Sequence, residues 1–115
     1  MDPLHLRQVL WNLGENAVQA LRNANLNTTV EWRYGRLAGG RPYLEVVDAG
    51  PGVPNAIAEH LFEPFYSGRS GGTGLGLFIA RELAACSGAT LRHEPRVPSG
   101  SVFRLVFADP QRWEA

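Results

Sequence analysis

A run of glycines that leads directly into a segment with helical periodicity constrains this chain more than any other feature. The run is Gly71-Gly72-Thr73-Gly74-Leu75-Gly76-Leu77, and residues 78–86 follow it with apolar residues at helical spacing. Glycine lets a backbone approach a ligand closely, and the first N–H groups of a helix carry partial positive charge without internal partners. The pattern therefore predicts a phosphate-binding loop at the start of a helix. All eleven basic residues are arginine, which excludes a Walker A loop because that loop requires a lysine.

The rest of the chain alternates helical and extended patterns in an irregular order. Three helices are expected, over residues 3–24, 56–61 and 74–87. Two hairpins are expected, one pairing residues 28–34 with 43–47 and the other pairing residues 89–93 with 101–107. A length of 115 residues suits one domain with a buried core. We therefore predict a single α/β domain over residues 1–115, a two-layer sandwich in which a mixed, mostly antiparallel sheet packs on about three helices.

Charge and cysteine content narrow the class of protein. The formal net charge is zero, so nothing favours nucleic acid or a membrane surface as a partner. The single cysteine, Cys86, falls on the apolar side of the helix expected over residues 74–87, and we expect it to pack in the core. One cysteine cannot form a disulfide framework, and the chain shows neither a membrane-spanning run nor a signal-peptide pattern. We expect a cytoplasmic domain, and attachment to a membrane sensor in a longer protein stays open.

The first helix carries amide side chains on one face. Asn12 and Asn16 are four residues apart, and Gln19 and Asn23 continue the same stripe. Asparagine is a poor helix former, so two of them inside a helix need a reason. One interpretation is a solvated polar face. The other is that a carboxamide oxygen binds Mg²⁺, a hard cation that prefers oxygen ligands.

An acidic residue stands at the end of the expected strand 43–47. Asp48 is followed by Gly50 and Gly52, and Asp and Gly are common in ordinary turns. Alternatively, the carboxylate accepts a hydrogen bond from the exocyclic amine of a base, and the glycines let the chain lie flat against that base.

Aromatic residues precede the glycine-rich loop. Phe62 and Phe65 are either core residues that anchor the loop residues 63–73 or the hinge anchors of a lid over a nucleotide, and both interpretations can hold. Arg69, inside this loop, is either a solvated charge or a phosphate clamp. We expect the loop to be mobile without nucleotide.

Taken in order, these segments resemble the four motifs of the catalytic and ATP-binding domain of two-component sensor histidine kinases, in the superfamily shared with gyrase B, Hsp90 and MutL. Residues 12–17 are similar to the N box and residues 48–52 to the G1 box, while residues 62–65 are similar to the F box and residues 72–77 to the G2 box. The sequence Asn16-Ala17-Val18-Gln19-Ala20 is more similar to the nitrogen-regulation and type IV pilus sensors than to other kinases. The resemblance implies a Bergerat-type ATP-binding fold.

The resemblance also implies a role for each matched residue. Asn16 would bind Mg²⁺, with Asn12 supporting it, and Asp48 would hold the amino group of adenine. Arg69 stands where many relatives carry a lysine, and it could supply a phosphate contact that Gln19 cannot. The remaining residues that would contact ATP are Gly50, Gly52, Phe62, Phe65, Gly72, Thr73, Gly74, Leu75 and Gly76.

The resemblance leaves several activities to weigh. Relatives that hydrolyse ATP use a carboxylate one turn before the metal-binding asparagine as a general base, and Asn12 cannot take a proton. This favours phosphoryl transfer from Mg-ATP to a protein histidine over hydrolysis. An anti-sigma-type protein serine kinase is one alternative, although such kinases usually carry an acidic residue at the position of Asn12. A non-catalytic binding module is the other, and the intact Asp48 and Asn16 speak against it.

The phosphate acceptor is expected outside this chain. His93-Glu94-Pro95-Arg96 superficially matches an acceptor sequence, but Pro95 would break the helix that an acceptor needs. The resemblance implies two partners, a histidine-bearing dimerisation domain of the same protein and a response regulator receiver domain. We expect the isolated domain to be a monomer and the full protein a homodimer. Because Asp2-Pro3 lies inside the domain in relatives, we also expect an N-terminal edge strand to be missing.

Overall fold

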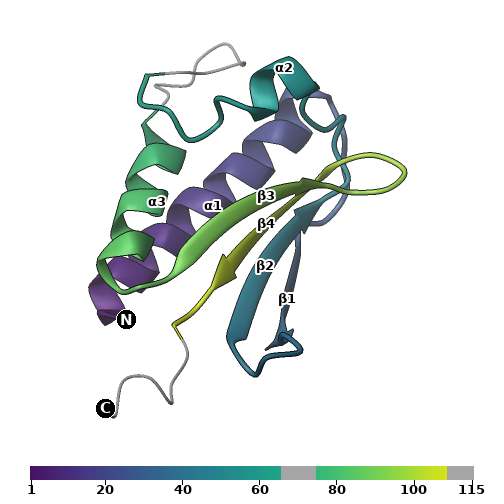
Figure 1. Ribbon diagram of the computed structural model, residues 1–115. Helices are drawn as coiled ribbons and strands as arrows, with labels where there is room; N and C mark the ends of the chain where they lie inside the picture. Colours follow the sequence, from purple (N-terminus) through teal and green to yellow (C-terminus); the bar gives the residue numbers. More distant parts are fainter. Residues whose placement is uncertain (66–74, 109–115) are drawn as a thin grey trace, which may run out of the picture.

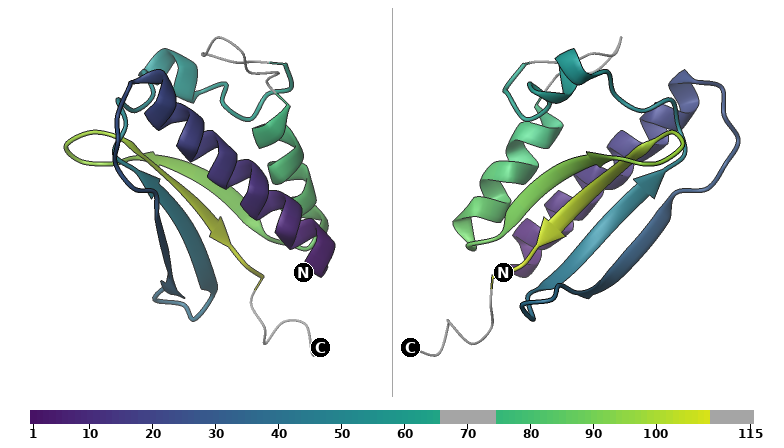
Figure 2. Two further views of the ribbon diagram at one scale, coloured as in Figure 1. Left: turned by 180° about the vertical axis from the view of Figure 1, so that it is seen from behind. Right: turned by 45° about the vertical axis from the view of Figure 1, so that its right-hand side comes forward.

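The computed structural model describes residues 1–65 and 75–108, and its elements form two layers (Figure 1). The helices are α1 (Pro3–Asn23), α2 (Asn55–Ala58) and α3 (Gly76–Cys86). The strands are β1 (Glu31–Arg36), β2 (Pro42–Asp48), β3 (Thr90–Pro95) and β4 (Ser101–Val106). They form one sheet in the order β1-β2-β4-β3, and α1 and α3 cover one face of it (Figure 2). This is the predicted α/β sandwich.

The first helix begins where its sequence directs. The Asp2 carboxylate accepts hydrogen bonds from the backbone N–H groups of Leu4 at 2.8 Å and His5 at 3.4 Å, and Pro3 occupies the first turn. One stripe of the helix is buried against the sheet, and it consists of Val9, Leu13, Ala17 and Leu21. This spacing of three and four residues keeps one face toward the sheet along the whole helix.

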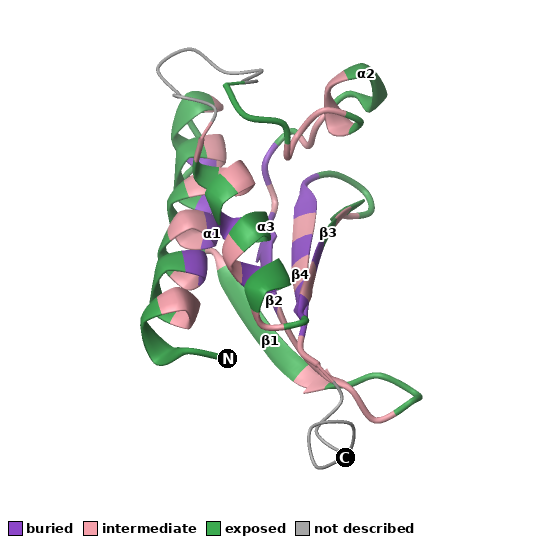
Figure 3. Ribbon diagram, turned by 60° about the vertical axis from the view of Figure 1, so that its left-hand side comes forward, coloured by how far each residue is buried: buried purple, intermediate pink, exposed green. Residues whose placement is uncertain are grey.

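The core lies between the two helices and the sheet, as the burial colours of Figure 3 show. Its largest fully buried side chains are Phe103, Leu13, Leu105, Val9 and Val46. Ala17, Ala80 and Ala84 join this cluster, so α1 and α3 meet through small side chains. All strand pairs are antiparallel, and Val46 lies opposite Phe103 in the pairing of β2 with β4.

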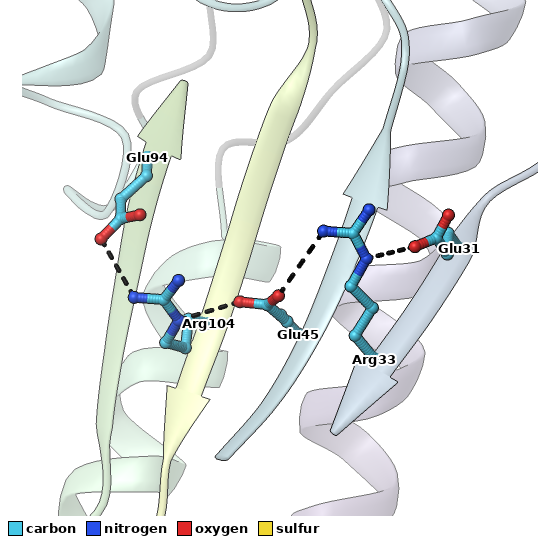
Figure 4. A network of polar contacts seen from close by, with 5 residues as sticks. All are labelled: Glu31, Arg33, Glu45, Glu94 and Arg104. Carbon is cyan, nitrogen blue, oxygen red and sulfur yellow. Dashed lines mark hydrogen bonds and ion pairs between the residues drawn. The ribbon is translucent and has the colours of Figure 1, made fainter. Parts of the chain in front are cut away.

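The other face of the sheet carries a polar network that crosses every strand (Figure 4). Glu45 of β2 lies at its centre, with its side chain only 8% exposed. Arg104 of β4 donates from Nε to Glu45 at 2.8 Å and from Nη1 to Glu94 of β3 at 3.1 Å. On the other side, Arg33 of β1 lies 4.0 Å from Glu45 and pairs with Glu31. The hydrogen bond to Glu45 raises the pKa of Arg104, which therefore stays charged.

Several boundaries differ from those expected. Strand β1 lies three residues later at its start than predicted and extends into the expected connection. Helix α2 has only four residues, and turns follow it to residue 65. Among residues 1–65 and 75–108 every strand pairing is antiparallel, so the parallel pair implied by a mixed sheet is not found there. Cys86 is exposed at the end of α3, so the prediction that it packs in the core was wrong.

Candidate functional site

One end of the sandwich gathers the end of α1, the end of β2, the helix α2 and the start of α3 (Figure 1). Asp48 is the last residue of β2 and pairs in register with Ser101, the first residue of β4. Its carboxylate is buried, and Oδ1 accepts a hydrogen bond of 3.0 Å from the backbone N–H of Gly50. A buried carboxylate is retained only where donors satisfy it. Asp48 is thus a fixed acceptor at this end of the sheet.

Glycines surround Asp48 because there is no room for side chains. A Cβ added to Gly50 would lie 3.0 Å from the Asp48 Oδ1 and 3.7 Å from the Ala20 Cβ of α1. Gly100, at the end of the β3–β4 turn, has φ +116°, and a Cβ there would lie 2.0 Å from the Asp48 carbonyl oxygen. Gly52 also has a positive φ, +81°. The Ser99 hydroxyl donates to the Gly50 carbonyl at 2.8 Å and ties this turn to the loop after β2.

The amide face of α1 connects this region to α3. The Asn12 Nδ2 donates to the Gly76 carbonyl at 2.9 Å, and its Oδ1 accepts from the Gln8 Nε2 at 2.8 Å. Both ends of the Asn12 amide are therefore engaged by protein. Asn16 follows one turn later and is half-buried. It lies one turn before Ala20, the residue that faces Gly50.

Asn16 supplies the kind of ligand that Mg²⁺ prefers, a carboxamide oxygen. Among residues 1–65 and 75–108 no group of three or more His, Cys, Asp or Glu side chains could hold a metal ion. The donor set of α1 therefore fits a cation that keeps several waters or binds together with a phosphate, as Mg²⁺ does.

The two phenylalanines predicted as anchors behave differently. Phe62 packs against the core, with its ring edge-on to Phe103 at a centroid distance of 6.2 Å. The Arg81 guanidinium of α3 lies 5.6 Å from the centre of the Phe62 ring, a cation–π contact. Phe65 is 77% exposed and has φ +64°, so it is not a core residue. A positive φ at a bulky residue is uncommon and marks a constrained turn.

Part of the predicted phosphate loop lies outside the described residues. This applies to Arg69, Gly72, Thr73 and Gly74, and to the prediction of a mobile loop around them. Leu75 immediately precedes α3 and is half-buried, and Gly76 is the first helical residue. No side-chain cap occupies the start of α3. The first N–H groups of a helix have no acceptor within the helix itself.

Sequence reasoning did not place His93, Gly100 or Ser101 in this region, although it considered His93 as a phosphate acceptor and rejected that role. The His93 Nε2 lies 3.0 Å from the Ser101 Oγ, and its ring packs on Phe103 at 4.9 Å between centroids. Burial lowers the pKa of His93, and Asp48 and then Glu94 partly oppose this shift. The position of His93 in β3 confirms that it is not on a helix. No motif indicated the contact of His93 with Ser101, because that contact depends on the pairing of β3 with β4.

The chain matches the family described as the histidine kinase-, DNA gyrase B- and HSP90-like ATPases over residues 1–111, and it belongs to that family. It is 41% identical to the sensor protein kinase PilS of Pseudomonas aeruginosa over 113 residues, which are 97% of this chain and 21% of PilS. It is 45% identical over 89 residues to the sensory histidine kinase/phosphatase NtrB of Klebsiella oxytoca, covering 71% of this chain and 26% of NtrB. The predicted kinship to pilus and nitrogen-regulation sensors is thus confirmed.

Solved structures show the same fold. The nucleotide-free catalytic domain of the histidine kinase ThkA has a TM-score of 0.78 and 30% identity, covering 93% of this chain and 68% of that domain. Full-length ShkA in complex with AMPPNP has a TM-score of 0.75 and 31% identity, covering 90% of this chain and 21% of ShkA. The chain spans about a fifth of the length of PilS. None of the helices within the described ranges is long and apolar enough to cross a membrane.

Proposed function

We propose that this domain binds Mg-ATP and, in a longer protein, donates the γ-phosphate to a histidine on a separate dimerisation domain. The phosphate would then pass to an aspartate of a response regulator receiver domain. The observation that carries this proposal is the buried Asp48 carboxylate, fixed by the Gly50 N–H beside the amide face of α1. A buried acceptor at the same end of the fold as a helix N-terminus suits a ligand with an amine at one end and phosphates at the other.

Asp48 would recognise the base. A carboxylate has several lone-pair directions, so Asp48 can accept from the Gly50 N–H and from an exocyclic amine of adenine together. Gly50 and Gly52 would let the backbone lie against the base plane. The steric limits at Gly50 support this, since a side chain there would push the Asp48 carboxylate out of place.

The start of α3 and the glycine-rich loop would hold the phosphates. Gly76 and Leu75 would present backbone N–H groups there, together with Gly72, Thr73 and Gly74. Asn16 would hold Mg²⁺, which would neutralise phosphate charge when bound. The link from Asn12 to Gly76 supports this arrangement, because it joins the metal-binding helix to the phosphate-binding helix.

Residues before α3 would close over the nucleotide. Phe62 is anchored against Phe103, while Phe65 is exposed. We propose that Phe62 is the fixed base of a lid and that Phe65 is free to contact a bound nucleotide. Arg69 would reach the γ-phosphate when the lid closes.

Phosphoryl transfer is favoured over hydrolysis by the engagement of Asn12. Its amide is held by Gln8 and Gly76, and an amide cannot accept the proton of an attacking water. Transfer would therefore await a histidine from outside the domain, and positioning and charge stabilisation would supply most of the rate. Such a reaction belongs in the cytoplasm, where ATP is supplied. The domain alone would be a monomer and the full protein a homodimer.

Labelled ATP tests this activity directly. The domain incubated with γ-labelled ATP should acquire no stable label, because it lacks the acceptor. Adding the histidine-bearing domain of the same protein should give a label on that domain that acid removes and base does not. An acid-stable label on a protein serine would contradict the proposal and favour a serine kinase. No transfer to any partner, with ATP still bound, would favour a binding module.

A further inference from the structure

A histidine lies within the wall of the proposed base pocket, where the three strands β2, β4 and β3 lie side by side. On the helix-facing side of the sheet, Asp48 pairs with Ser101, and His93 lies diagonally across from Ser101. The His93 Nε2 and the Ser101 Oγ are 3.0 Å apart. The Ser101 hydroxyl therefore lies between an imidazole and the carboxylate that would hold the base.

We propose that His93 is a positioning residue of this pocket: its neutral ring orients the Ser101 hydroxyl beside Asp48, and its protonation weakens nucleotide binding. This inference rests on the proposed binding of ATP. His93 would not touch the nucleotide in order to act. It would work through Ser101 and through its charge near Asp48.

The hydrogen-bond geometry gives the first reason. A neutral imidazole can accept a hydrogen bond from the Ser101 hydroxyl at Nε2. A protonated ring can only donate there, so the hydroxyl proton has to turn toward another acceptor. Asp48, directly opposite Ser101 in the strand pair, is the acceptor at hand. A hydroxyl that donates to Asp48 would compete with the amino group of the base.

Burial gives the second reason. The His93 ring is half-buried and packs on Phe103, and this burial lowers its pKa below the ordinary histidine value. A base lying in the pocket would remove more water from the ring and would engage the negative charge of Asp48. Both changes disfavour the imidazolium, so binding would lower the pKa of His93 further and release a proton to the buffer.

Within the part of the chain that the structure describes, two carboxylates act on the charge of the ring. Asp48 at the end of β2 and Glu94 in β3 favour protonation of His93. On the same side of the sheet, Arg81 of α3 lies over the Phe62 ring that contacts Phe103. After α2, His60 Nδ1 pairs with Glu63 at 2.6 Å. The pKa of His93 is expected to be lower in the nucleotide-bound protein than in the free protein. The affinity for nucleotide should therefore be highest above the pKa of His93 in the free protein, and it should fall as the pH drops through that pKa.

Calorimetry of the whole chain with Mg-ADP at about pH 7.5 and about pH 5.5 tests this, since the pair brackets the ordinary histidine pKa. The wild type should lose at least threefold more affinity at the lower pH than His93→Phe, whose aromatic ring keeps the packing on Phe103. Each unit of pKa difference between free and bound protein is worth a factor of about ten. Phosphate protonation is common to both proteins and cancels in the comparison.

Proton release provides a second measurement. Titrations near pH 6 in two buffers of different ionisation enthalpy should show a proton released by the wild type and less by His93→Phe. The control His5→Gln, near the start of α1, should behave as the wild type. Ser101→Ala should flatten the pH dependence, because it removes the hydroxyl that would turn toward Asp48 when His93 is protonated.

The outcomes separate the two proposals. If the wild type and His93→Phe bind nucleotide with the same pH profile and the same proton release, the inference about His93 is overturned while ATP binding stands. If the wild type binds no nucleotide at either pH, the proposed function fails and the inference fails with it. Should His93→Phe not fold, Ser101→Ala with its proton release decides the question by the same criterion.

Discussion

Asp48 shows how closely a single residue can be fixed by its neighbours. Its side chain accepts from the Gly50 N–H, and its carbonyl oxygen lies against the backbone of Gly100. The first contact joins residues two apart, while the second joins residues that meet only because β2 and β4 pair. The local contact favours a conformation of the loop, and the distant contact excludes every residue except glycine at position 100.

Replacing Gly100 with alanine should therefore destabilise the domain by about 2 kcal/mol or more, because the new Cβ would clash with the Asp48 carbonyl and φ is +116°. Urea unfolding followed by circular dichroism measures this difference. Gly39→Ala is the matched control, since nothing lies within 4 Å of its Cβ position. Equal loss of stability in the two variants would contradict the description of the site.

Whether the sequence could indicate a residue of the site depends on how far away in the sequence its contact partner lies. The sequence indicated Asp48, Gly50 and Asn16 because each lies in a short motif, and their roles stay predictions. It did not indicate His93 and Ser101 as partners, since their contact depends on the diagonal register of β3 and β4. Sequence periodicity identifies strands but does not say which side chains meet across them. The interpretation of Phe65 as a core residue was wrong: its bulky apolar side chain suggested burial, but the residue has a positive φ and its side chain is exposed. Its interpretation as a lid anchor stays a prediction.

Helices α1 and α3 pack closely because small residues lie between them. Ala17, Ala80 and Ala84 are fully buried in the shared core cluster. This close packing places the start of α3 within hydrogen-bond reach of Asn12. The separation of the two helices therefore sets the distance between the proposed metal-binding and phosphate-binding groups.

Enlarging Ala80 to leucine should cost about 1–3 kcal/mol through overpacking and should weaken Mg-nucleotide binding, because α3 would move away from α1. Thermal unfolding and calorimetry measure the two effects. Ala85→Leu, on the exposed side of the same helix, should change neither by much. An Ala80→Leu protein of normal stability and affinity would show that the helix spacing is unimportant.

The boundaries of helices and strands were predicted best where the pattern of apolar residues is long and regular. Helix α1 begins at its expected residue because an Asp-Pro pair caps its start, and it ends within one residue of its expected end because the apolar spacing stops at Leu21. Strand β1 was placed too early, because the β-branched residues Thr28, Thr29 and Val30 suggested an earlier start, whereas pairing with β2 begins only at Glu31. Helix α2 is shorter than expected because the turns that follow it connect to Phe62, which packs on the core.

The whole molecule is a sheet with two different faces. One face carries the apolar core and, at its end, the candidate site, and the other carries the ion-pair network centred on Glu45. This network links all four strands, so it stabilises the sheet as a unit. It also holds β2 and β4 together along the length that leads to Asp48 and Ser101.

Glu45→Gln should destabilise the domain by about 1–3 kcal/mol, because Arg33 and Arg104 would lose their shared carboxylate. The loss should shrink as salt is added, since both arginines are partly exposed. Glu94→Gln removes a more exposed carboxylate from the end of the same network, and it should cost less than about 1 kcal/mol. Equal costs for the two variants would show that Glu45 is not the centre of the network.

The most direct test of ATP binding at Asp48 is calorimetric titration with a non-hydrolysable ATP analogue, with and without Mg²⁺. Asp48→Asn should bind at least about tenfold more weakly than the wild type, because it loses a charged acceptor for the base. Asp2→Asn makes the same chemical change at the far end of α1 and should bind normally. Binding by the wild type should strengthen with Mg²⁺. Undiminished binding by Asp48→Asn, or no binding by the wild type, would contradict the account.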